Sequence, residues 1–286
     1  MLRKVISIQP GLPQQMGELT IHQPLPSSGL QDLDPFLLLH HLGPKFMEKG
    51  NQGLPFGPHP HRGFEAVSFI FKGSVLHHDS RGNKSTISDG GVQWMTAGMG
   101  IIHSENLSKE MQANGGPLEL IQLWINLPAH LKMTQPVYQG FQKTEIPVVT
   151  SFEDKNSVNV IAGNYKTVKG PVNSITGIMA LTIELEKGGK FHIEINSDQS
   201  ILIYILSGLV TVNGTSAGAL SLIQIGLEGT EIIIKANSSA SLLFCTGKAT
   251  HENIVQHGPF VMNSTTEIME AMRDYKLGKM GILIEE

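Results

Sequence analysis

Two short segments of this sequence carry pairs of metal-binding side chains two residues apart. His59 and His61 form the first pair, and His103 and Glu105 form the second. In an extended strand, side chains two residues apart point to the same face, so each segment can direct both of its side chains at one point. Imidazoles together with a carboxylate suit a first-row transition metal. The spacing therefore predicts a metal site formed by two strands.

A second carboxylate competes for the place of the fourth ligand. Glu65 follows His61 by four residues and is expected on the same strand face, where it could bind the metal or orient a ligand from behind. Glu105 is expected on the same strand as His103, which makes joint coordination by these two stereochemically easy. From the residues alone, both carboxylates are candidates.

The other histidines and the single cysteine are expected to have structural roles. His40 with His41, and His77 with His78, are adjacent pairs. Their members should point to opposite faces of a strand, so neither pair can chelate a metal as the spaced pairs do. Cys245 lies in an apolar run and has no partner for an internal disulfide. It is expected to be a buried structural thiol in a reducing compartment.

The composition is that of a globular protein rich in turns. Hydrophobic residues make up 40% of the chain and charged residues 16%, and 31 glycines and 15 prolines interrupt runs of Ile, Val, Leu and Phe. This pattern predicts an all-β protein. The net charge of −4 without a basic cluster argues against direct binding of nucleic acid. Because neither a signal sequence nor an apolar stretch of membrane-spanning length is recognised, we expect a cytoplasmic protein that does not enter the membrane.

Short strands separated by glycine and proline are expected between residues 31 and 127. Apolar residues that alternate with polar or aromatic ones are typical of half-buried strands. The predicted strands are 65–71, 74–79, 92–95, 100–103 and 119–126.

The second half of the chain resembles the first. Residues 204–210 echo residues 69–75 at an offset of 135 positions, and comparable runs follow. We interpret this as an internal duplication, with a metal-binding domain at 1–130 and a second domain at 131–286 that ends in a helix.

The second domain is expected to hold no metal. The offset of 135 positions places Glu194 and Asn196 where His59 and His61 stand. A carboxylate and an amide at these positions do not reproduce the histidine pair, so a structural role is expected for this domain.

A short helix is expected near the end of the chain. Ser264 and Glu267 form a capping box, and Gly278 is a stop signal. Four apolar side chains fall on one face, which we expect to pack against a barrel: Ile268, Met269, Met272 and Tyr275.

Several longer motifs resemble the pirin family of the cupin superfamily, and the resemblance runs nearly from end to end. The motifs are 58–65, 79–84, 92–98, 103–105, 122–128 and 258–264. The resemblance implies a bicupin, with two antiparallel jelly-roll β-barrels, a short C-terminal helix and one metal in the first barrel.

The resemblance also implies a site and an activity. Carried over by motif, the metal ligands are His59, His61, His103 and Glu105. Family members are associated with iron, so Fe(II) is expected, with Cu, Ni, Mn, Co or Zn as alternatives. They are also associated with quercetin 2,3-dioxygenase activity, which implies a flavonol and O2 as substrates.

The expected chemistry follows from the ligand count. Four protein ligands on an octahedral metal leave two positions for substrate and O2. A flavonol could chelate there through its 3-hydroxyl and 4-carbonyl oxygens, with Glu105 as the general base that takes the hydroxyl proton. The alternative is an iron-dependent regulatory or interaction protein, which acts on a transcription factor or a metabolic enzyme as partner and has only incidental dioxygenase activity.

Overall fold

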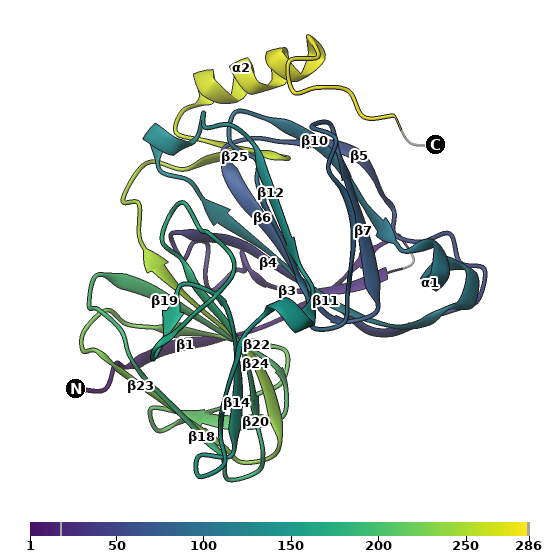
Figure 1. Cartoon of the computed structure of the whole chain (residues 1–286). Coiled ribbons are helices and arrows are strands. Elements are labelled where there is room, and N and C mark those ends of the chain that lie inside the picture. The colour runs from purple at the N-terminus through teal and green to yellow at the C-terminus, as the bar shows by residue number, and fades with distance from the viewer. Residues whose placement is uncertain (18, 285–286) are drawn as a thin grey trace. The chain divides into compact units, whose positions relative to one another are not determined.

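Strands dominate the computed structural model of this chain, which describes residues 1–17 and 19–284 (Figure 1). The chain forms two compact units that are interleaved in sequence. The first, called here the histidine unit, is formed by three stretches, 15–21, 38–143 and 250 onward. The second unit is formed by the other three stretches, 1–14, 22–37 and 144–249.

A seven-stranded and a four-stranded sheet lie mostly in the histidine unit. The seven strands are, in spatial order, β12 (Val137–Phe141), β9 (Val92–Thr96), β6 (Phe64–Lys72), β11 (Gly116–Asn126), β4 (Phe36–Met47), β3 (Leu19–Leu25) and β2 (Leu12–Met16). The four strands are β5 (Phe56–His61), β10 (Ile101–Leu107), β7 (Ser74–Asp79) and β8 (Lys84–Ser88). This unit also holds the short helix α1 (Lys109–Asn114) and the ribbon of β25 (Val255–His257) and β26 (Phe260–Met262).

The second unit contains sheets of the same two sizes. The seven strands are β1 (Val5–Pro10), β22 (Ser221–Ile225), β19 (Gln199–Ser207), β24 (Ala240–Lys248), β17 (Met179–Leu185), β14 (Asn156–Ala162) and β13 (Val148–Ser151). The four strands are β18 (Lys190–Glu194), β23 (Glu231–Ala236), β20 (Leu209–Val212) and β21 (Thr215–Gly218). A two-stranded ribbon joins β15 (Asn164–Tyr165) to β16 (Val168–Lys169).

The two units repeat one strand order. The order β5-β10-β7-β8 corresponds to β18-β23-β20-β21, and β9-β6-β11-β4-β3-β2 corresponds to β22-β19-β24-β17-β14-β13. This agreement supports the internal duplication inferred from the sequence. The two-domain all-β fold with a short C-terminal helix is confirmed.

The compact units are not contiguous along the chain, unlike the expected domains at 1–130 and 131–286. Strand β1 pairs with β22 of the second unit, with Ile8 opposite Ile223. It occupies the edge that β12 occupies in the histidine unit. An edge strand can come from any part of the chain that reaches the sheet, so a break in composition does not reveal it.

The strand that carries His103 and Glu105 is longer than expected. Strand β10 continues from Ile101 to Leu107, whereas the expected strand stopped at His103. It continues because it is central in its sheet and pairs with β5 on one side and β7 on the other. His103 and Glu105 therefore lie within one strand, whose pairing is regular with β7 and shifts in register between these two residues on the β5 side.

The terminal helix α2 (Thr265–Lys276) begins where the capping box indicates. The Ser264 Oγ accepts the Glu267 backbone N–H at 3.3 Å, and the Glu267 carboxylate accepts the Asn263 N–H at 2.9 Å. Lys276 is the last helical residue, and Gly278 follows in the left-handed region. Among the described residues, no helix has both the length and the apolar character needed to cross a membrane.

The expected apolar face of α2 is only partly correct. Ile268 is buried with Ala271 against Phe260 and Met262 of the β26 strand. The other three residues of the expected face, Met269, Met272 and Tyr275, are between 36% and 66% exposed. The inward contacts of the helix come from residues three positions apart, Ile268, Ala271 and Asp274. The Asp274 carboxylate accepts two hydrogen bonds from the buried Arg62 guanidinium, at 3.1 and 3.2 Å.

Substitutions on the two faces of α2 should therefore have different effects. Ile268→Ala leaves a cavity against the β26 strand and should lower the free energy of unfolding by about 2–5 kcal/mol. Met269→Ala, the matched change on the exposed face, should alter it by less than about 0.5 kcal/mol. Urea denaturation followed by circular dichroism measures both. Equal losses for the two variants would contradict the observed orientation of the helix.

Candidate metal centre

Three histidines from two strands converge at one point of the histidine unit. In the pairing of β5 with β10, His59 stands opposite His103, and His61 follows two residues after His59 on the same face. One ring nitrogen of each histidine lies within 4.8 Å of the corresponding nitrogens of the other two. The ring centroids are 4.4–4.9 Å apart. The convergence of His59, His61 and His103 expected from their spacing is thus present.

The outer ring nitrogens of His59 and His61 face main-chain carbonyls. His59 Nδ1 lies 2.8 Å from the Gly57 carbonyl oxygen, and His61 Nδ1 lies 3.4 Å from that of Pro259. A carbonyl oxygen can only accept a hydrogen bond, so each Nδ1 carries the proton and each Nε2 keeps its lone pair. This arrangement directs ligand atoms inward.

The inner nitrogens fit a bound cation. Within the described part of the chain, the Nε2 atoms of His61 and His103 are buried and have no hydrogen-bond partner. A buried polar atom without a partner destabilises the fold. Coordination of a transition metal by neutral imidazoles would satisfy both atoms, so the donor set fits such an ion.

Burial keeps these imidazoles neutral. It lowers the pKa of His61 well below the ordinary value, and the neighbouring His59 lowers it further. The pKa of His103 is also well below the ordinary value, first through burial and then through the other histidines around it. Both side chains are therefore ready to bind a metal at neutral pH without first losing a proton.

Glu105 lies on the same side of β10 as His103, and both of its oxygens accept hydrogen bonds. Oε1 accepts from the Ser68 hydroxyl at 2.8 Å, and Oε2 accepts from the Gln122 amide at 2.6 Å. These donors fix the orientation of the buried carboxylate. Its role as the fourth ligand stays a prediction.

Glu65 lies on the face of its sheet opposite to the one that carries Ser68 and Gln122. Ser68 pairs with Gln122, and Glu65 pairs with Ile125 in the same ladder. Because faces alternate along a strand, Glu65 and Ser68 point to opposite sides. The wholly buried Glu65 accepts a hydrogen bond from Thr96 Oγ1 at 2.8 Å. The expectation that Glu65 shares a face with His61 is wrong, since a turn separates β5 from β6.

A cavity of about 190 Å³ opens beside the histidines. Its polar lining includes His59, His61, Glu105 and Gln122. The apolar lining is larger and comes from Met16, Ile21, Leu42, Leu54, Phe56, Val75, Leu120 and Trp124. An apolar cavity with a few convergent polar groups is typical of a small-molecule site.

A buried lysine holds the turn that follows His61. The Lys132 ammonium donates to the Gly63 carbonyl at 2.8 Å, to Asn126 Oδ1 at 2.7 Å and to the Val261 carbonyl at 3.1 Å. Gly63 has a φ of +88°, and a Cβ there would collide with the Val261 carbonyl oxygen. The end of β5 is therefore fixed in place by contacts that only glycine permits.

The matching positions of the second unit have a different chemistry. Val212 takes the place of His77 by the offset of 135 positions, and it pairs with Ile234 as His77 pairs with Glu105. Both Val212 and Ile234 are wholly buried in an apolar cluster. Aliphatic side chains thus fill the space that holds polar groups in the histidine unit.

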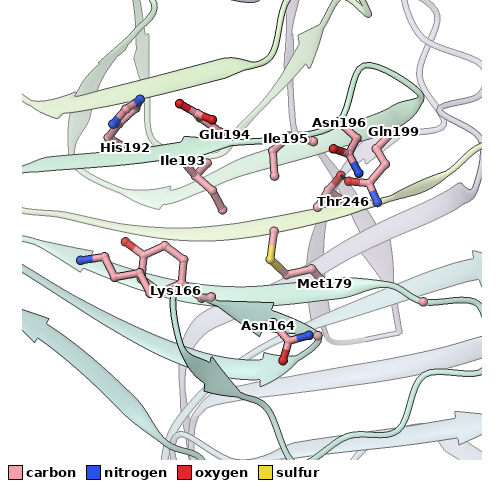
Figure 2. A pocket seen from close by; sticks show the side chains of 13 residues that line it. Asn164, Lys166, Met179, His192, Ile193, Glu194, Ile195, Asn196, Gln199 and Thr246 are labelled. Atoms are coloured by element: carbon pink, nitrogen blue, oxygen red, sulfur yellow. Dashed lines mark hydrogen bonds between the residues drawn. The ribbon is translucent and has the colours of Figure 1, made fainter.

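A larger hollow of about 550 Å³ lies in the second unit (Figure 2). Glu194 and Asn196, at the positions of His59 and His61, contribute to its wall together with Lys166 and His192. Its lining combines polar side chains with the apolar Met179, Ile193 and Ile195. Among the described residues, the three histidines that could hold a metal ion converge beside the smaller cavity.

Two polar residues near the site were not expected to take part. The adjacency of His77 and His78 predicts a structural role for His77, and its ring contacts His103. Asp79 lies two residues further along β7, and its carboxylate accepts a hydrogen bond from His77. The signal was present in the sequence, because His77 and Asp79 have the same spacing as the two ligand pairs.

Comparisons with known proteins give one consistent result. A family described as Pirin matches residues 18–125, and the Pirin C-terminal cupin domain matches residues 180–281. Pirin of Homo sapiens is 34% identical over 262 residues, which cover 88% of this chain and 84% of the human protein. A pirin-like protein of Solanum lycopersicum is 38% identical over 256 residues, covering 88% of this chain and 84% of the tomato protein. The crystal structure of quercetin 2,3-dioxygenase from Acinetobacter baumannii aligns with a TM-score of 0.93 at 35% identity, over 99% of this chain and 100% of that one.

Removal of one histidine should abolish tight metal binding. We expect one divalent ion per chain, and His61→Ala should weaken Co(II) binding by more than about 100-fold, because loss of a ligand costs more than the 10–100-fold typical of an outer partner. Isothermal titration calorimetry measures the affinity and the stoichiometry. His192→Ala, in the second unit, is the matched control and should bind as the unchanged protein does. Two ions per chain, or equal losses in both variants, would refute the assignment.

Metal binding should release few protons at mildly acidic pH. At pH 6.5, three ordinary imidazoles would together release about 1.5 protons, because each would be half protonated. The pKa values of His61 and His103 lie well below this pH, so these two should release almost none and the total should stay below about one proton. Calorimetry in buffers of different ionisation enthalpy gives the number. A release near 1.5 protons would show that burial does not keep these ligands neutral.

Proposed function

The chain belongs to the pirin family, and from that premise we propose that it is a metal-dependent dioxygenase that cleaves flavonols such as quercetin. The observation that carries this proposal is the convergence of three histidines whose inward nitrogens face one point. A solved relative with 35% identity over nearly the whole chain is named quercetin 2,3-dioxygenase. Substrate and metal are both assigned to the histidine unit.

The proposed ligands are His59, His61, His103 and Glu105. Each carboxylate oxygen of Glu105 has two lone pairs, so hydrogen bonds from Ser68 and Gln122 leave capacity to bind a metal. Three imidazoles and one carboxylate suit iron(II), which we propose as the native ion, and they also accept other divalent transition metals.

The bound metal would supply a redox-active Lewis acid that holds the substrate oxygens and O2 together. The chain supplies orientation, proton transfer and exclusion of water. Glu105 would accept the proton of the flavonol hydroxyl, because electron density for oxidation is highest in the ionised substrate. The Ser68 and Gln122 donors would hold the carboxylate in place during this transfer.

The apolar walls of the cavity favour a planar aromatic ligand. Phe56, Leu42 and Trp124 contribute to its apolar lining, and such a surface excludes water from the reacting atoms. The volume of about 190 Å³ is below the roughly 300–1,000 Å³ typical of pockets that enclose a whole drug-sized ligand. We therefore expect the chelating ring system to enter the cavity and the remainder of the flavonol to stay outside it.

A turnover assay tests the proposal. Iron-loaded protein should consume quercetin and O2 and release carbon monoxide, and His59→Ala should lower the rate to the background level because the metal is no longer held. His192→Ala should keep the full rate. Activity that survives both chelation and His61→Ala would show that another site is responsible. No turnover by fully loaded protein would favour the alternative, an iron-dependent interaction protein.

A further inference from the structure

Two buried side chains stand behind the third histidine of the site. His77 and Asp79 come from β7, which pairs with β10 so that His103 is opposite Asp79 and Glu105 is opposite His77. All four side chains therefore lie on one face. His77 and Asp79 are each only 1% exposed, and neither has a part in the ligand set proposed above.

Hydrogen bonds link Asp79 to His77 and His77 to His103. The Asp79 Oδ2 lies 2.9 Å from His77 Nε2, and His77 Nδ1 lies 3.5 Å from His103 Nδ1. The inner nitrogen of His103, Nε2, is buried and faces the point where the ligands converge. The outer nitrogens of His59 and His61 face backbone carbonyls instead, so His103 is the ligand whose outer nitrogen depends on a side chain.

The Asp79 carboxylate can only accept hydrogen bonds here. Its Oδ1 receives the backbone N–H groups of Arg81 and Asn83 at 2.9 and 3.1 Å, and the Asn83 amide donates to both oxygens at 3.2 and 2.9 Å. An acceptor surrounded by donors stays an ionised carboxylate. His77 must therefore present an N–H at its Nε2 to make the observed contact.

The proton positions then follow in order. Neutral His77 with a proton on Nε2 has a lone pair on Nδ1. This lone pair faces His103 Nδ1, which must carry the proton of that contact. His103 is left with a lone pair on Nε2, the form that a metal requires.

An aromatic contact sets the plane of the middle ring. Tyr138 of β12 stacks on His77 with centroids 4.0 Å apart and an interplanar angle of 12°. The Tyr138 hydroxyl and the Ser85 hydroxyl share a hydrogen bond of 2.6 Å. The ring of His77 is thus held between a stacked partner and two hydrogen bonds, which limits its rotation.

We propose that Asp79 and His77 are positioning residues that set the tautomer and ring orientation of His103 for metal binding. The inference rests on the metal site of the proposed function. It assigns a role to two residues outside the ligand set. In this role the Asp79 carboxylate determines which nitrogen of His77, and through it which nitrogen of His103, carries the proton.

The test uses Co(II) as the probe and the full-length protein. His77→Phe keeps a ring that can stack on Tyr138 but removes the acceptor for His103, so we expect Co(II) to bind 10–100-fold more weakly. The matched control is His78→Phe, the next residue of β7, which points to the other face and should bind Co(II) as the unchanged protein does. Calorimetry measures the affinity.

Proton NMR of the Co(II) protein reports the tautomer directly. The Nδ1–H protons of coordinated histidines appear as separate paramagnetically shifted signals that disappear when they exchange with solvent. In the unchanged protein, the His103 signal should be protected by its buried contact with His77. In His77→Phe it should exchange rapidly, while the signals of His59 and His61 keep their original rates.

A third variant, Asp79→Asn, tests whether the Asp79 carboxylate sets the proton positions of the two histidines. It also keeps the proposal testable if His77→Phe does not fold. In Asp79→Asn the amide oxygen should stay with the three donors at Oδ1, which turns the NH2 group toward His77 Nε2. The tautomers of His77 and His103 should then invert, with the same 10–100-fold loss of Co(II) affinity. His77→Gln, whose amide oxygen can accept from His103, should recover part of the affinity lost in His77→Phe.

The outcomes separate this inference from the proposed function. If the unchanged protein does not bind Co(II) through the three histidines, the proposed metal site is wrong. If it does bind, while His77→Phe and Asp79→Asn keep its affinity and its protected N–H signal, the site stands and the positioning role is refuted.

Discussion

The pairing of β5 with β10 is the constraint on which the site depends. It places His59 opposite His103, and a slip by one residue would turn the imidazoles of one strand to the other face. Several features hold this register. β10 is paired on both sides, and β5 ends in a turn that the buried Lys132 fixes through the Gly63 carbonyl. The geometry of the ligands is therefore a property of the sheet and does not require a flexible loop.

The site also contains an unfavourable feature, because ring nitrogens are buried there without hydrogen-bond partners among the described residues. Burying imidazole nitrogens without partners is unfavourable, and apolar side chains surround them on the cavity side. The outer nitrogens are satisfied by carbonyls or by His77, so the cost is confined to the inward atoms that face the metal position. A ligand that binds only the folded state stabilises it by mass action. Metal binding and folding of the histidine unit are thus thermodynamically coupled.

The second unit has the same strand order, but its interior is apolar. Its interior is filled by branched aliphatic and aromatic side chains, among them Ile203, Ile234 and Phe244. In the histidine unit the corresponding space holds Ser68, Glu105 and Gln122, which satisfy each other's hydrogen bonds. Duplication of one fold has therefore produced a unit whose cavity holds a few convergent polar groups and a unit with an apolar core.

Local patterns in the sequence are sufficient for the features that depend on neighbours along the chain. His59 shares a strand face with His61, and His103 shares one with Glu105, because faces alternate along a strand. The start of α2 at Ser264 follows from its capping box, because a cap is satisfied within one turn. These features are encoded by residues a few positions apart, so they can be read without knowing the rest of the fold.

Contacts between distant segments decided the rest. The face of Glu65 depends on a turn that separates β5 from β6, and the role of His77 depends on the pairing of β7 with β10. Likewise, Ile268 is buried and Met269 exposed because of where α2 meets the β26 strand. Periodicity specifies that a residue has a face, but only the packing of segments far apart in sequence specifies what that face meets. For this reason the sequence by itself determined that the side chains of His59 with His61, and of His103 with Glu105, share a strand face, whereas the tertiary structure decided which polar side chains stand behind them.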